Sequence, residues 1–235
     1  MTIAVIIPTL NEASMIVATI RHTTALGFDE IVVVDGGSSD QTGRLVDSCV
    51  SCAQHSALST VRLMQAPPGR ARQLNAGAKT VCTDVLLFLH ADTKLPTGAR
   101  QLIESAVTDP AVVGGRFDVR FDRTSMWSRM IALFMNFRSR LTRISTGDQA
   151  MFVRRHVFER LRGFSDIPMM EDIEFSMRLK RVGQIVALHE RVVTSFRRWE
   201  QQGPLRTILL MWTLRFLYWI GVSPHRLQRF YASVR

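Results

Sequence analysis

The strongest constraint on the fold is the alternation of short apolar runs with helical patterns over the first 90 residues. The runs lie at 3–8, 31–34, 60–64 and 85–89, and the helical patterns at about 12–26, 40–53 and 70–80. Strands that alternate with helices in this way pair in parallel through right-handed crossovers. The sequence therefore predicts an α/β fold with a mostly parallel sheet flanked by helices.

The pattern changes after residue 110. Residues 112–121 alternate like a half-exposed strand, which predicts a mixed sheet. Residues 126–144 form an apolar helical pattern that carries four arginines, and 149–153 form a short apolar run. No linker rich in proline, serine or glycine divides the chain. We therefore expect one domain at 1–203, with halves at 1–95 and 96–203, and then an apolar, amphipathic helical extension at 204–235.

Polar residues follow three of the predicted strands at the point where each strand ends. Open α/β sheets bind ligands at this carboxyl edge. Asp35 suits a hydrogen bond from a base N–H, and Asp92 suits Mg²⁺ or Mn²⁺, which prefer carboxylate and phosphate oxygens. The alternative for Asp92 is an ordinary aspartate that caps the next turn. The candidate binding residues are Pro8, Thr9, Asn11, Glu12, Asp35, Gly36, His90, Ala91 and Asp92.

Charged residues also mark the starts of two predicted helices. Arg70 and Arg72 can reach phosphates with help from a helix N-terminus, and the alternative is a solvated basic turn. Glu171 and Asp172 precede a helical pattern at 173–182. Two acids there are either partners of the helix dipole, or one of them is a general base for a hydroxyl nucleophile.

Positive charge is concentrated in the second half of the chain. The net charge is +10, but residues 1–119 carry −2 and residues 120–235 carry +12. All but three of the 30 basic residues are arginine, which suits phosphates and anionic lipid surfaces, although codon bias is an equal explanation. The rival class is a nucleic-acid-binding protein. We expect no nucleic-acid partner, because no motif for one is present and the arginines coincide with apolar helices.

The cysteine content favours a cytoplasmic protein. The chain has three cysteines, an odd number that does not fit a secreted disulfide framework. The apolar start at 3–7 is too short for a secretory signal and has no basic residues before it.

The chain carries seven motifs, which are VIIPTLNE at 5–12, VVDGGSSDQT at 33–42, GRARQLNAGA at 69–78, FLHADTKLP at 88–96, GDQAMFVRR at 147–155, GFSDIPMMEDIEFSMRLKRVG at 163–183 and RRW at 197–199. With these motifs in this order, the chain resembles the family 2 glycosyltransferases over nearly its whole length. The resemblance implies the GT-A fold, a Rossmann-like mixed sheet of mostly parallel strands.

The resemblance implies roles for the residues at the strand ends. Thr9 and Glu12 would line the base pocket, and Asp35 would contact the nucleobase. His90 and Asp92 occupy the positions of the family's DxD motif. Asp92 matches the carboxylate that coordinates the divalent metal, Mg²⁺ or Mn²⁺.

Further roles follow for the charged loops. The stretch with Arg70, Arg72 and Asn75 resembles the one that holds the ribose and phosphates of the donor. Asp172 matches the catalytic base of an acidic pair that it forms with Glu171. The acceptor side resembles a loop that comprises Gly147, Asp148 and Gln149.

The chain departs from the family pattern at two places. His90 stands where the first acid of the DxD motif is usual, so either imidazole replaces a carboxylate or metal dependence is weaker. Many relatives have a metal-binding histidine after the last strand, where this chain has residues 193–197. Arg197 or Arg198 would neutralise the diphosphate instead. Trp199 would either stack on an acceptor sugar or pack within the protein.

Together these features imply an inverting glycosyltransferase of the hexosyltransferase type. It would move a sugar from a UDP- or GDP-linked donor to an acceptor hydroxyl, and the acceptor would be lipid-linked or membrane-associated. A sugar-nucleotide nucleotidyltransferase is the nearest alternative. That class has a glycine-rich GxGTR-like loop after the first strand, where this chain has PTLNE.

The apolar segment at 205–222 is 18 residues long, which barely reaches the length that spans a membrane. Arg215 would lie inside the hydrocarbon layer, which disfavours a transmembrane helix. An interfacial helix flanked by Arg206, Arg226 and Arg229 fits a peripheral protein on the anionic inner face of the cell membrane. The alternatives are a homodimer interface through the C-terminal helices and packing onto the protein's own core.

Overall fold

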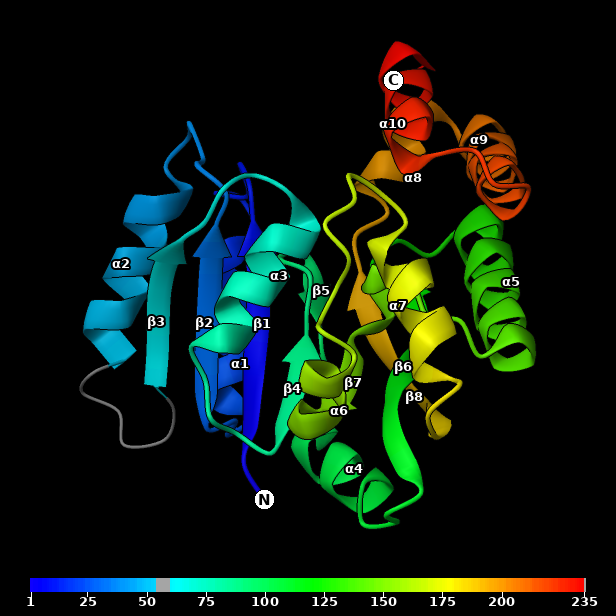
Figure 1. Ribbon diagram of the computed structural model, residues 1–235. Helices are drawn as coiled ribbons and strands as arrows, with labels where there is room; N and C mark the ends of the chain where they lie inside the picture. The colour runs from blue at the N-terminus through cyan, green and yellow to red at the C-terminus, as the bar shows by residue number, and fades with distance from the viewer. Residues whose placement is uncertain (54–59, 235) are drawn as a thin grey trace.

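The computed structural model describes residues 1–53 and 60–234. The strands within this part of the chain are β1 (Ile3–Thr9), β2 (Glu30–Asp35), β3 (Thr60–Gln65), β4 (Val85–Phe88), β5 (Thr93–Lys94), β6 (Val112–Phe121), β7 (Met151–Arg154) and β8 (Gln184–Thr194). They form one eight-stranded mixed sheet in the order β3-β2-β1-β4-β7-β6-β8-β5 (Figure 1). The predicted α/β class with a mixed sheet is confirmed.

The chain order reverses beside β1. This strand pairs in parallel with β2 on one side and with β4 on the other. The carboxyl ends of the three strands therefore open onto one edge at a switch point, where open α/β sheets bind ligands. Thr9 pairs in register with Asp35, and His90 follows the end of β4.

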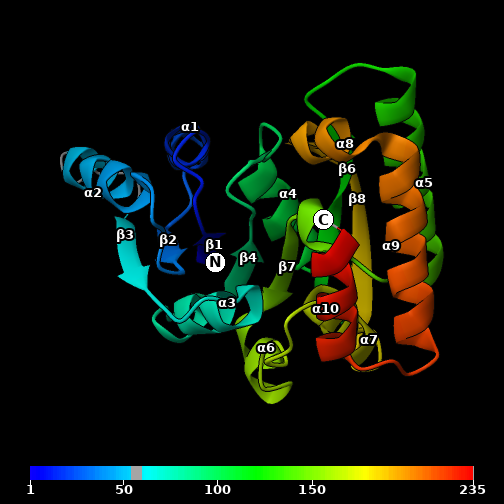
Figure 2. The same ribbon diagram turned by 90° about the horizontal axis from the view of Figure 1, so that it is seen from above.

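Helices cover both faces of the parallel half of the sheet (Figure 2). One face packs against α1 (Ile16–Ala25), α2 (Thr42–Ala53) and α4 (Ala99–Ala106). The opposite face packs against α3 (Arg70–Lys79), α6 (Arg155–Arg160) and α7 (Glu171–Leu179). Ile3 and Val5 point to the first core, and Ala4 and Ile6 to the second. Burial on both faces explains why the strands are continuous apolar runs.

The second half of the chain adds antiparallel pairing that completes the edge. β7 runs antiparallel between β4 and β6, so its first residue, Met151, pairs with Phe88 at the end of β4. A 3₁₀ turn, η1 (Gly147–Gln149), immediately precedes β7. This pairing places the turn beside His90, 57 residues earlier in the chain.

Four helices form the outer part of the second half: α5 (Met126–Thr142), α8 (Arg197–Gln202), α9 (Pro204–Trp219) and α10 (Pro224–Val234). Helices α5 and α9 lie side by side (Figure 2), and Ile131 packs with Ile208 in one cluster. Leu214 and Leu227 join α9 to α10 and pack against Met170, just before α7. Among the described residues, no helix is long and apolar enough to cross a membrane.

The predicted elements occur with shifted ends. The helix expected at 12–26 begins at Ile16, because residues 10–15 form the turn that carries Asn11 and Glu12 along the site edge. The strand expected from residue 149 begins at Met151, because the turn η1 takes up Gln149. The helix expected at 173–182 is α7, which already includes Glu171 and Asp172 as its first residues.

Candidate functional site

Asp35 is the last residue of β2, at the carboxyl edge of the sheet, and it is buried, at 4% exposure. The backbone N–H of Ser38 donates to its Oδ2 at 3.0 Å, and the Ser38 hydroxyl donates to its Oδ1 at 2.5 Å. Gln73 on α3 donates to the carbonyls of Thr9 and Val34, at 2.8 Å each, and so joins the ends of β1 and β2. Sequence reasoning assigned no role to Gln73, although it lies within one of the quoted motifs.

The turn after β1 is fixed to the loop after β2. Asn11 adopts a left-handed backbone conformation with φ 57°, which asparagine tolerates better than most residues. Its backbone N–H donates to Ser38 Oγ at 2.9 Å. Glu12 pairs with Arg197, with 3.4 Å between Oε2 and Nη2. Burial raises the pKa of Glu12, as does the charge of Asp92, against the opposing effect of Arg197.

Asp92 follows β4 and carries no ion pair among the described residues. Burial raises its pKa, and so does the charge of Asp148, while His90 and Arg197 oppose the shift. His90 Nδ1 lies 3.2 Å from Asp148 Oδ1. Loss of water would raise the pKa of Asp148, but the His90 hydrogen bond, with the charges of His90 and two arginines, lowers it to about 2.

Glu171 and Asp172, the acidic pair at the start of α7, contact residues at the same edge of the sheet. Asp172 Oδ2 accepts from the Gly147 backbone N–H at 2.8 Å, and Oδ1 accepts from the Ile173 N–H at 2.7 Å. Glu171 is buried, and its Oε1 lies 3.1 Å from Arg70 Nη1. Burial raises the pKa of Glu171, and so does Asp172, although Arg70 opposes both.

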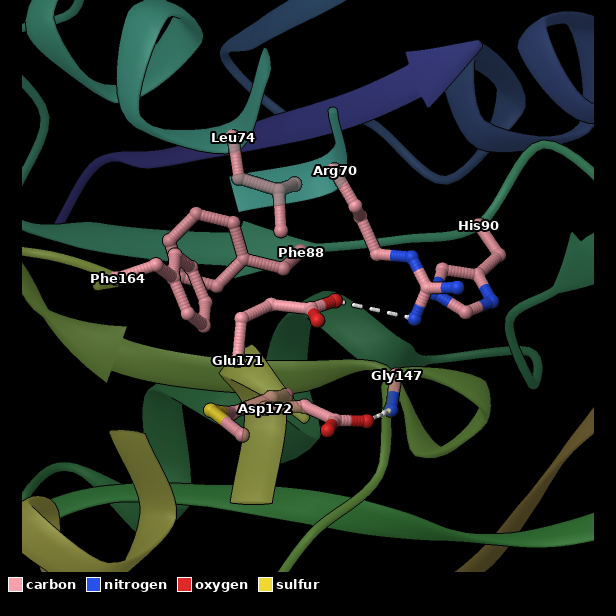
Figure 3. A pocket seen from close by; sticks show the side chains of 9 residues that line it. Arg70, Leu74, Phe88, His90, Gly147, Phe164, Glu171 and Asp172 are labelled. Carbon is pink, nitrogen blue, oxygen red and sulfur yellow. Dashed lines mark hydrogen bonds and ion pairs between the residues drawn. The ribbon is translucent and has the colours of Figure 1, made fainter. Parts of the chain in front are cut away.

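These groups meet in one pocket, shown in Figure 3. Arg70 reaches from α3 toward both acids of α7 and toward the ring of His90. Desolvation lowers the pKa of Arg70, but four surrounding carboxylates raise it above its usual value. The pocket is lined by Arg70, Leu74, Phe88, His90, Gly147, Met151, Phe164, Glu171 and Asp172.

Two predicted donor-binding residues face away from this pocket. Arg72 forms an exposed ion pair with Asp166, with 2.8 Å between Nε and Oδ1. The amide of Asn75 donates to the Phe164 carbonyl at 2.7 Å and accepts from the Phe164 N–H at 2.9 Å. Both side chains thus hold the loop before α7 onto α3.

Two residues predicted on the acceptor side, Gln149 and Trp199, have side chains that contact other residues of the protein. Gln149 is fully buried, and its amide donates to Ser139 on α5 at 3.0 Å. Trp199 is partly buried and packs on the rings of Phe121 and Phe196, at centroid distances of 6.0 and 6.3 Å. This arrangement matches the packing alternative for Trp199.

The remaining predicted residues lie at the margins of the site. Pro8 is part of β1, and Gly36 follows β2 directly against Gln73. The carbonyl of Ala91 accepts from the Thr19 hydroxyl at 2.5 Å and is directed toward α1. The guanidinium carbon of Arg198 lies 5.2 Å from the centre of the Tyr231 ring. The charge of Arg198 also helps to lower the pKa of Asp148.

A comparison with protein families identifies the chain. The profile described as "Glycosyl transferase family 2" matches residues 4–162. The chain belongs to glycosyl transferase family 2.

Curated proteins with related sequences carry corresponding names. A probable glycosyltransferase of Bacillus subtilis, YdaM, is 26% identical over 85% of this chain and 50% of its own length. An undecaprenyl-phosphate 4-deoxy-4-formamido-L-arabinose transferase of Yersinia pestis is 29% identical over 67% of this chain and 50% of its own. The chain thus spans about half the length of the curated relatives it matches.

Solved structures of glycosyltransferases show the same GT-A fold. The mannosyltransferase PcManGT from Pyrobaculum calidifontis, in complex with GDP-Man and Mn²⁺, gives a TM-score of 0.67 at 21% identity. That match covers 81% of this chain and 56% of the mannosyltransferase. TarS 1–349 of S. aureus with UDP-GlcNAc gives 0.62 at 16% identity, over 83% of this chain and 58% of that one.

Proposed function

We propose that this family 2 enzyme transfers a sugar from a nucleoside diphosphate sugar to an acceptor hydroxyl, in a single displacement that inverts the anomeric carbon. The complexes of PcManGT with GDP-Man and of TarS with UDP-GlcNAc support a GDP- or UDP-linked donor. The name of the Yersinia relative supports a lipid-phosphate acceptor.

The observation that carries the proposal is the position of Asp172. Backbone N–H groups bind both of its carboxylate oxygens, which fixes the side chain at the pocket. Each oxygen retains a further lone pair that can accept a proton from a hydroxyl. Since Arg70 and His90 lie across the same pocket, an acceptor beside Asp172 would attack from the side opposite the donor diphosphate.

The donor would lie along the ends of β1, β2 and β4. Asp35 would receive the base, and Arg70 would meet the phosphates with two of its guanidinium nitrogens. Arg197 reaches the same edge through its ion pair with Glu12, where it would balance charge on the leaving diphosphate.

The chemistry at Asp92 fits a divalent cation. Its carboxylate is partly buried and has no ion-pair partner in the described part of the chain, and its pKa is raised mainly because burial removes water from it. No group of three or more His, Cys, Asp or Glu residues that could hold a metal occurs among the described residues. Mg²⁺ or Mn²⁺ would therefore take its other ligands from donor phosphates and water. When bound, such an ion neutralises the diphosphate.

A thermal-shift screen of UDP, GDP and their sugars, each with and without Mn²⁺, tests the donor site. Ligand at about 100 times its Kd adds about 2.7 kcal/mol to the free energy of unfolding, which raises Tm by several degrees. We expect one nucleotide series to stabilise the protein more strongly with Mn²⁺. The anomeric configuration of the product, read by NMR, tests inversion. Absence of any nucleotide-dependent shift would contradict the donor site.

We further propose that the apolar outer face of α5 and α9 contacts an anionic membrane. This outer apolar face comprises the exposed side chains of Met126, Trp127, Leu133, Phe134, Phe137, Leu141, Leu205, Leu209, Trp212, Phe216, Trp219 and Ile220. Aromatic side chains suit the membrane–water interface, and residues 120–235 carry a charge of +12. The same face would bring a lipid-linked acceptor to the site.

A further inference from the structure

Two arginines that form no salt bridge in the described part of the chain belong to helices that contact the surroundings of Asp172. Arg138 belongs to α5 and Arg215 to α9, which lie side by side (Figure 2). Ser139, the neighbour of Arg138, bonds Gln149 in the turn whose Gly147 bonds Asp172. Leu214, the neighbour of Arg215, packs in a cluster with Met170 just before α7. This contact brings α9 against the start of the helix that carries Asp172.

The guanidinium of Arg138 is poorly satisfied. Its Nε and Nη2 are shielded from solvent, and neither has a hydrogen-bond partner. Nearby arginines differ, because Arg116 and Arg140 both pair with Asp118, at 2.5 and 2.9 Å. No hydrogen bond or ion pair of the Arg215 side chain occurs among the described residues. Unpaired buried donors cost free energy, so the two shielded nitrogens of Arg138 are suited to an acceptor that the described part of the protein does not supply.

The charge of Arg215 acts on Arg138, and both guanidiniums interact with the charge of Asp172. Burial lowers the pKa of Arg138, and the charge of Arg215 contributes further, to give about 10. Burial also lowers the pKa of Arg215. The charge of Asp172 opposes both shifts, and that of Asp148 also opposes the shift of Arg215. Two like charges therefore lie in a partly desolvated region, and Asp172, the proposed base, is a carboxylate that partly compensates both.

We propose that Arg138 and Arg215 form an anion subsite that holds a phosphate group of the acceptor beside Asp172. A phosphate monoester carries a charge of about −1.5 to −2, which two guanidinium groups balance. The planar guanidinium fork also matches phosphate oxygens in bidentate contacts. This assignment rests on the proposed function, because it specifies the acceptor of that transfer.

The phosphate comes either from a lipid or from a soluble ester. Each arginine has an exposed phenylalanine as its neighbour in sequence, Phe137 at 62% and Phe216 at 57% exposure. A phosphate in the subsite would therefore lie beside the outer apolar face, which suits an acceptor with a hydrocarbon chain.

Binding of hexyl phosphate and of hexanol to the full chain tests the subsite. UDP or GDP is kept at saturation, so that the donor's own phosphate site is filled. We expect hexyl phosphate to bind at least tenfold more tightly than hexanol, and Arg138→Gln and Arg215→Gln each to abolish most of this difference. Arg129→Gln removes the same charge from an exposed position on α5 and should leave binding unchanged.

A second readout separates binding from a structural role. Because the arginines are unpaired, their replacement by glutamine should leave Tm unchanged or raise it, whereas loss of a structural contact would lower it. Equal binding of hexyl phosphate by wild type and both variants would overturn the proposal, as would an equal loss in Arg129→Gln.

A vesicle arm identifies the source of the phosphate. Phosphatidylcholine vesicles with a polyprenyl phosphate are compared with vesicles that lack it, again with nucleotide bound. Phosphate-dependent capture that is lost in Arg138→Gln supports a lipid source, and hexyl phosphate binding without such capture supports a soluble one. If the protein binds hexyl phosphate but transfers no sugar to any acceptor, the proposed function fails while the subsite stands.

Discussion

At the scale of single residues, the proposed reaction depends on Asp172, whose carboxylate is fixed by hydrogen bonds from two backbone N–H groups. Asp172→Asn keeps the shape of the side chain and one oxygen for the Gly147 N–H, but the amide cannot take a proton. We expect kcat to fall by about 10²- to 10⁴-fold, while the Kd for the nucleoside diphosphate stays within twofold. Initial rates and calorimetric titration measure the two quantities.

The matched control is Asp166→Asn, at an exposed acid that pairs with Arg72 outside the pocket. This variant should retain wild-type turnover. Near-normal turnover in Asp172→Asn would mean that another group is the base.

Asp92 should limit the stability of the ligand-free protein. Its raised pKa means that the folded state binds this proton more tightly than the unfolded state does. The stability that Asp92 contributes is therefore present at low pH and is lost as pH rises through the raised value. At pH 7.5 we expect Asp92→Asn to raise Tm without ligand, with a difference that shrinks toward acid pH.

The same substitution should weaken the metal-dependent part of donor binding. We expect nucleotide affinity with Mn²⁺ to fall by roughly 10- to 100-fold, and affinity without metal to change little. Thermal unfolding at several pH values, with and without nucleotide and Mn²⁺, measures both effects. An unchanged effect of Mn²⁺ in Asp92→Asn would show that Asp92 is not a metal ligand.

The direction of helical side chains explains why Arg70 lines the pocket and Arg72 does not. Arg70 and Arg72 are two positions apart, about 200° round a helix, so they cannot face one pocket. Leu74 follows Arg70 by four positions on the same face and does line it. Strand ends are simpler, because parallel pairing brings Thr9 and Asp35 to one edge without knowledge of side-chain direction.

At the scale of elements, the turn η1 joins the two sides of the pocket and leaves no room for a larger residue. A Cβ on Gly147 would overlap the ring of His90. We expect Gly147→Ala to lower the free energy of unfolding by about 1–3 kcal/mol and to reduce kcat, because the Asp172 hydrogen bond shifts. Denaturant unfolding and initial rates measure the change.

Gly43→Ala is the control for this substitution. A Cβ at Gly43 meets nothing within 4 Å, and its position in α2 favours alanine, by up to about 1 kcal/mol. If both variants were equally stable, the turn would be free to move away from His90.

The sequence predicted β1 to β4 well, because each is a continuous apolar run between helical patterns. β8 was harder to delimit from sequence. It contains the polar residues His189, Glu190 and Arg191, and its register against β6 shifts between the partners of Phe117 and Asp118. Two extra residues in β8 absorb this shift, and the polar stretch hides the strand from a search for alternation.

At the scale of the whole molecule, the site is assembled by strand order. No local pattern predicts that β7 inserts antiparallel between β4 and β6, yet this insertion brings Gly147 and Asp148 to His90. The motifs were found because their residue types are chemically distinctive. Their distances depend on long-range pairing, which periodicity in one segment does not encode.

Charge is distributed unevenly over the whole molecule, and the basic second half of the chain also carries the outer apolar face. Burial of an aromatic ring contributes about 1.5–3 kcal/mol, so Trp212→Glu with Phe216→Glu should reduce flotation with phosphatidylglycerol vesicles by more than tenfold. Both rings are more than half exposed, so the fold should tolerate the change. Binding of the wild type should weaken with salt and be far lower on neutral vesicles, because attraction to anionic lipid is screened.

Gln201→Glu with Gln228→Glu adds the same two negative charges at exposed positions of α8 and α10 and removes no aromatic ring. This control should lose much less flotation than the aromatic variant, since only its long-range charge changes. An equal loss of flotation in both variants would mean that net charge alone drives membrane binding. Retained flotation together with a smaller mass of the aromatic variant in sedimentation would make the outer apolar face a dimer interface, and the acceptor would then have to reach Asp172 without passing along a membrane-bound α9.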